Sequence, residues 1–76
     1  MYCFRLRRGE SEMIEEHGAE FADDRTACVE AMRTAKEIAL DRAVNGADLA
    51  LINFQIAHPN GWVLDTIPLE SLVRTN

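Results

Sequence analysis

The sequence predicts an α+β fold in which a β-hairpin, one amphipathic helix and a second β-hairpin follow one another along the chain. Apolar and polar side chains alternate over residues 2–7 and again over 51–57, which is the period of a strand with one buried face. Between them, over about 24–45, apolar residues recur every three or four positions, as on one side of a helix. The expected structure is a four-stranded antiparallel sheet with the helix on one face.

Length and composition predict a single small α+β domain over residues 1–76. Hydrophobic residues make up 47% of the chain and charged residues 28%, which is typical of a folded protein. A domain of this size has a thin core, and such domains often need a metal, a disulfide or a partner subunit. No apolar run approaches the ~18 residues that span a bilayer. A cytoplasmic protein without membrane contact is therefore expected.

The first hairpin begins with a strand whose two faces differ in chemistry. Tyr2, Phe4 and Leu6 lie on one face, and Cys3, Arg5 and Arg7 lie on the other. Gly9 predicts the turn, because glycine adopts a positive φ without a Cβ clash. The charged segment 12–15 is expected to return as a short strand at the sheet edge.

The helix has recognisable signals at both ends. Asp23 is the predicted N-cap, because its carboxylate can accept hydrogen bonds from free N–H groups of the first turn. Asn45-Gly46 predicts the end, since glycine favours the left-handed conformation that follows a helix. The apolar stripe is mostly alanine, so the helix is expected to lie close to the sheet. The stripe comprises Cys28, Ala31, Met32, Ala35, Ile38, Ala39 and Ala43.

The turn of the second hairpin is predicted at residues 58–61, as a type I turn with Gly61 in a bulge. This turn sets His58 opposite Trp62, Ile56 opposite Leu64 and Phe54 opposite Thr66. A two-residue turn at Asn60-Gly61 would instead set Ile56 opposite Asp65. Burying that carboxylate would cost more than a longer turn, so the bulged register is predicted.

The bulged register places Ala57, Val63 and Ile67 on the outer face of the sheet, which points away from the helix. That face is then half apolar, and we expect it to bind a partner. After the last strand, residues 69–73 are expected to close the domain as a short helical turn. The side chains predicted to be most buried are Phe4, Leu6, Ala35, Ile38, Phe54 and Ile56.

Short motifs run through the chain. They are Tyr2-x-Phe4-x-Leu6, the segment 18–23 before the helix, the alanines at 27, 31 and 35, Phe54-x-Ile56, Gly61-x-Val63-Leu64 and Ile67-Pro68-Leu69. With these motifs the chain resembles, over nearly its whole length, a family of short bacterial proteins known only as a domain of unknown function. Members usually carry a further aromatic residue beside Phe4 and a proline near Ala22, where this chain has Arg5 and alanine. The resemblance implies the ββαββ order and no particular activity.

No motif for catalysis, a metal or a cofactor stands out. Cys3, His17, Cys28 and His58 include zinc-binding residue types, but they lack the close CxxC or HxxxH pairs of a structural zinc site. His17 is expected in a solvated loop and His58 in the hairpin turn. A disulfide between the two cysteines is not expected. The prediction is therefore a protein that is not an enzyme, with no catalytic, cofactor-binding or metal-binding residues.

Three functional hypotheses follow from these patterns. The first is a non-catalytic protein-interaction module or small accessory subunit, a homodimer or bound to a protein partner through the outer sheet face. The second is an acidic inhibitor or decoy that mimics a nucleic-acid backbone, since the net charge is −5. That charge disfavours nucleic-acid binding itself, in spite of Arg5, Arg7 and Trp62. The third is a small cysteine-dependent redox protein using Cys3, which shares a strand face with Arg5.

Overall fold

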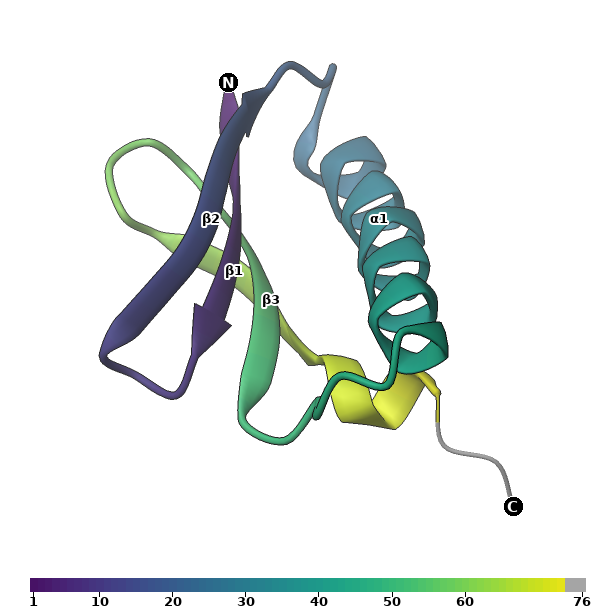
Figure 1. Ribbon diagram of the computed structural model, residues 1–76. Coiled ribbons are helices and arrows are strands. Elements are labelled where there is room, and N and C mark those ends of the chain that lie inside the picture. The colour runs from purple at the N-terminus through teal and green to yellow at the C-terminus, as the bar shows by residue number, and fades with distance from the viewer. Residues whose placement is uncertain (74–76) are drawn as a thin grey trace.

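The computed structural model describes residues 1–73 and has the predicted ββαββ order. The elements are β1 (Tyr2–Arg8), β2 (Glu12–Ala19), α1 (Asp24–Val44), β3 (Ile52–Ala57), β4 (Val63–Pro68) and a 3-10 helix, η1 (Leu69–Leu72). The strands form one antiparallel sheet in the order β2-β1-β3-β4, and α1 lies on one side of it (Figure 1). The predicted α+β fold is confirmed. Residues 74–76 of the predicted domain lie outside the described residues.

The hydrophobic core lies between the sheet and α1. β1 contributes Tyr2, Phe4 and Leu6 to it, as the alternation of this strand predicts. Of the six side chains expected to be most buried, five are buried and Ile38 is half-buried. The short helix η1 confirms the predicted closing turn, and its Leu69 is fully buried in the same core.

Helix α1 approaches the sheet through a stripe of its smallest side chains. It begins after the predicted N-cap, where the Thr26 N–H donates to Oδ1 of Asp23 over 2.8 Å. This hydrogen bond lowers the pKa of the Asp23 carboxyl. The buried residues recur every fourth position and have no exposed surface: Ala27, Ala31, Ala35 and Ala39. The buried stripe is therefore rotated about the helix axis relative to the predicted stripe, since Cys28 is only half-buried and Ala43 is exposed.

Strand β2 is longer than predicted, because it pairs with β1 as far as Ala19 rather than ending at residue 15. His17 was expected in a loop, but it lies on this strand opposite Phe4. The prediction was wrong because charged side chains on an edge strand reach solvent without disrupting the backbone pairing. A bulge at Ile14 interrupts the pairing, and Ile14 packs against the core.

The turn of the second hairpin forms as predicted. Gly61 has a φ of 95° and donates its N–H to the His58 carbonyl over 2.9 Å. The His58 N–H donates to the Trp62 carbonyl over 2.8 Å, so these two residues lie opposite each other. The local turn chemistry of the sequence therefore fixes this end of the hairpin.

Beyond the turn, the predicted register is wrong. Leu64 is an extra residue in β4, so Ala57 pairs with Val63 while Ile56 pairs with Asp65. Phe54 consequently faces Ile67, which is 5% exposed in the core and not on the outer face. Asp65 stays exposed because β4 is an edge strand. The expected cost of burying its carboxylate therefore does not arise.

Candidate interaction surface

The outer face of the sheet is built from three rows of paired residues. The first row is Met13, Arg7, Asn53 and Pro68; the second is Glu16, Arg5, Gln55 and Thr66; the third is Gly18, Cys3, Ala57 and Val63. Within residues 1–73, α1 and η1 both pack on the opposite face, so no element covers these rows (Figure 1). The outer face is therefore an open surface of the described chain.

The polar side chains in the central row of this face are already paired with one another. Nε of Arg5 donates to Oε2 of Glu16 over 2.6 Å in the central row. In the same row, Nε2 of Gln55 donates to Oγ1 of Thr66 over 3.4 Å. A shallow hollow of about 450 Å³ lies over this region, and Arg5 and Gln55 are among its lining residues. A partner would thus meet a shallow polar centre in which Arg5 is paired with Glu16, while Arg7 donates to the Glu10 carbonyl.

The apolar part of the outer face differs from the prediction. Of the three predicted interaction residues, Val63 is 41% exposed there, Ala57 lies there but has no exposed surface, and Ile67 is in the core. The Met1 side chain lies so close to Gly18 that a Cβ at position 18 would collide with it. Met13, on the first row, is 42% exposed. The accessible apolar groups are therefore Met1, Met13, Val63 and Pro68, and sequence reasoning placed only Val63 among them on this face.

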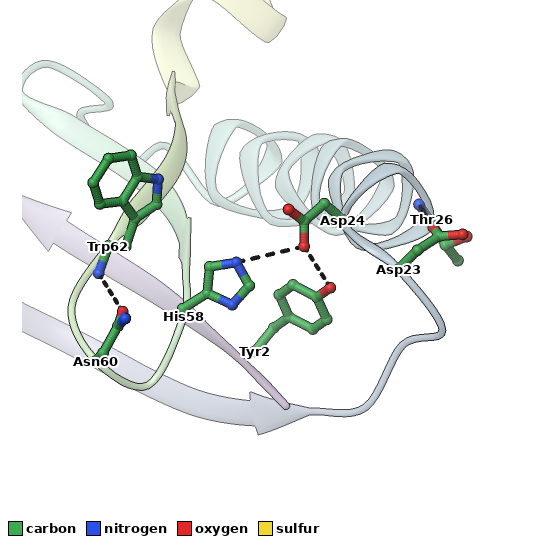
Figure 2. A network of polar contacts seen from close by, with 7 residues as sticks. All are labelled: Tyr2, Asp23, Asp24, Thr26, His58, Asn60 and Trp62. Carbon is green, nitrogen blue, oxygen red and sulfur yellow. Dashed lines mark hydrogen bonds and ion pairs between the residues drawn. The ribbon is translucent and has the colours of Figure 1, made fainter.

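A separate polar cluster joins β1, the first turn of α1 and the β3–β4 turn (Figure 2). The Tyr2 hydroxyl donates to Oδ1 of Asp24 over 2.7 Å, and Nε2 of His58 lies 3.4 Å from the same oxygen. The Tyr2 and His58 rings are 5.1 Å apart. The hydrogen bond to Asp24 and burial raise the pKa of Tyr2 to about 12, so its hydroxyl stays protonated at neutral pH. The cluster connects three elements, and the protonated Tyr2 hydroxyl does not act as a base.

The family model described as domain of unknown function DUF6894 matches residues 1–70. The chain belongs to this family. The predicted resemblance to a family known only as a domain of unknown function is therefore confirmed, and the description assigns no activity. No curated protein and no solved structure matches the chain. Over residues 1–73, no helix combines the length and apolar character needed to cross a bilayer.

The two cysteines of this DUF6894 protein lie on different sides of the sheet. Cys3 is half-buried on the outer face, beside Ala57. Cys28 is on α1, where burial and the carboxylates of Asp65 and Asp24 raise the pKa of its thiol. A protonated thiol is a poor nucleophile, so the environment of Cys28 does not favour redox chemistry.

Several carboxylates of the DUF6894 chain are each bound to a different group. Glu12 pairs with Arg8, Glu16 pairs with Arg5, and Asp23 caps α1. Among residues 1–73, no three histidine, cysteine or acidic side chains come together as a metal site. The decoy hypothesis requires a ridge of free carboxylates, and this pairing does not favour one.

The Tyr2 contact makes a testable prediction about pH. The pKa of Tyr2 in the folded protein lies above its ordinary value of about 10. The contact with Asp24 therefore contributes its full stabilisation below pH 10, and that contribution is lost as the pH rises toward 12. Tyr2 is the only tyrosine, so ultraviolet titration of tyrosinate reports this group alone. We expect a midpoint near 12 in the folded protein and near 10 in denaturant. The Tyr2→Phe variant should lose this alkaline phase and melt several degrees lower. A folded-state midpoint near 10 would contradict the assignment.

Proposed function

We propose that this protein is a non-catalytic protein-interaction module, a small accessory subunit of the cytosol whose outer sheet face binds a protein partner. The observation that carries the proposal is the open outer face, which no described element covers and which bears the exposed side chains of Met1, Met13 and Val63. A thin two-layer domain gains stability when such a face is covered.

The chemistry of this face suits a protein partner. Protein interfaces combine apolar side chains with arginine and neutral polar groups and contain few free charges at their centre. Here Arg5 is already paired with Glu16, so a partner covers a neutralised pair instead of an isolated cation. The pairing of Glu12 with Arg8 and of Glu16 with Arg5 gives less support to the decoy hypothesis. The redox hypothesis uses Cys3, and it is less supported because the neighbouring cation Arg5 is already bound to Glu16.

Affinity capture from the native host tests the proposal. Tagged wild-type protein should recover a specific partner, counting untagged copies of this chain as a candidate. The Val63→Lys bait should lose that partner, because it places an ammonium group in the covered face. The Glu37→Lys bait, altered on the exposed side of α1, should retain it. Equal recovery of every bound protein by the wild-type and Val63→Lys baits would contradict the proposal.

A further inference from the structure

We infer that the partner on the outer face is a second copy of this chain, stacked face to face with its strands aligned. A twofold axis parallel to the strands places β1 of each copy over β3 of the other, and β2 over β4. This inference rests on the proposed function and adds the identity of the partner and its orientation. Aligned sheets pack about 10 Å apart and within about 30° of parallel.

The polar side chains of the two central strands select this axis. β1 carries the cations Arg5 and Arg7 on the outer face, whereas β3 carries the neutral amides Gln55 and Asn53. With β1 over β3, each arginine meets an amide whose carbonyl oxygen can accept its N–H groups. With the axis across the strands, β1 would cross its own copy and Arg5 would meet Arg5. Arginine has no acceptor atom, so the second arrangement leaves the facing guanidinium N–H groups without a partner in the other copy.

The edge strands bring apolar side chains together in the same arrangement. β2 over β4 places Met13 of one copy against Pro68 of the other, since both belong to the first row. Along the third row, Gly18 with the overlying Met1 meets Val63. The twofold axis repeats both contacts, so the exposed apolar groups of this face are covered at its four corners.

The dimensions of the chain set an upper limit on the area of this face. The described chain measures 34 × 25 × 18 Å, so a two-layer molecule of this shape offers a broad face of up to 34 by 25 Å. A standard interface covers ~800 Å² on each partner. An interface of this size therefore requires most of the broad side, including the turns at the margins of the sheet.

Other surfaces fit a second copy less well. Edge-to-edge pairing through β2 would bring together strands that carry Glu15 and Glu16. The β4 edge is interrupted by its bulge and by Pro68, which lacks an N–H group. The exposed side of α1 has apolar groups such as Leu40, but Arg33 and Lys36 lie among them. The same side also carries Glu37 and Asp41, so a twofold contact there would cover more charged groups than the outer sheet face does.

Sedimentation equilibrium of the purified protein at micromolar concentration tests the dimer. We expect twice the chain mass of 8.6 kDa for the wild type. Val63→Lys should raise the dimer dissociation constant by about a hundredfold or more, because each dimer carries the change twice. Gln55→Arg, which sets a cation against Arg5 of the other copy, should also weaken the dimer. Leu40→Lys, an equivalent change on α1, should leave the dimer intact. A monomeric wild type, or a dimer lost only with Leu40→Lys, would overturn the inference.

Cross-linking tests the orientation in a background where Cys3 and Cys28 are replaced by alanine, provided that this background remains dimeric. Met13→Cys and Pro68→Cys chains are mixed and treated with a short bismaleimide. Aligned stacking with β2 over β4 predicts mixed links, in which the thiol introduced on β2 of one chain joins the thiol introduced on β4 of the other. Links between two Met13→Cys chains, without mixed links, would overturn this orientation.

The inference and the proposed function fail in different ways. A monomeric wild type that still captures a different protein through Val63 would exclude the second copy and leave the interaction module standing. A wild type whose self-association and captured proteins are all insensitive to Val63→Lys would contradict both.

Discussion

Replacing Ala35 by leucine is expected to lower the free energy of unfolding by about 1–3 kcal/mol or more. Ala35 has no exposed surface and lies in the alanine stripe through which α1 contacts the sheet. A leucine there must force the helix away from the core or adopt a strained rotamer. Urea unfolding followed by far-ultraviolet circular dichroism measures the loss.

The matched control is Ala43→Leu, which places the same side chain at an exposed position of the same helix. Alanine and leucine have similar helix propensities, so this variant should change stability by about 0.5 kcal/mol or less. Equal losses for the two variants would contradict the close approach of α1 through its alanines.

Replacing Ile67 by alanine is expected to cost about 2–5 kcal/mol, because Ile67 is buried in the core opposite Phe54. Val63→Ala, four residues earlier on the same strand, should cost about 0.5 kcal/mol or less in the monomer, since Val63 is partly exposed. Urea unfolding measures both losses, at a protein concentration low enough to keep the chain monomeric.

This pair of variants separates the two registers of the second hairpin. If the register set by the turn continued along β4, Ile67 would lie on the outer face and tolerate alanine. A loss for Ile67→Ala no larger than for Val63→Ala would therefore contradict the bulge at Leu64.

Features that depend on neighbouring residues could be predicted from the sequence. The face of β1 that carries Phe4 follows from strand alternation alone. The start of α1 follows from Asp23, whose carboxylate accepts from the Thr26 N–H. The turn at residues 58–61 follows from the left-handed preference of Gly61. In each case the determining contacts lie within a few positions along the chain.

Features that depend on contacts between distant segments could not be predicted. The register predicted for β4 depends on the assumption that the alternative register would bury Asp65. The edge position that keeps Asp65 exposed is a property of the assembled sheet. The length of β2 is set by pairing with β1, which overrides its polar composition. A shift of one residue in the pairing of β4 with β3 is enough to move Ile67 from the outer face into the core.

The candidate surface shows the same division. Val63 was placed on the outer face from the turn, and the structure puts it there. Met1 and Met13 were missed, because their position follows from the full pairing of β1 with β2. The contact of Tyr2 with Asp24 spans 22 positions, and no local pattern connects them.

The proposal that the outer sheet face binds the partner is tested most directly by one ratio. It is the amount of partner recovered with Val63→Lys bait divided by the amount recovered with Leu40→Lys bait, from the same native lysate. Both variants replace a partly exposed aliphatic residue by lysine, so they share the same net charge and differ in the face that they alter. A ratio of about one tenth or less is predicted, corresponding to at least about 1.4 kcal/mol of lost binding. A ratio of one or above would contradict the assignment of the outer face.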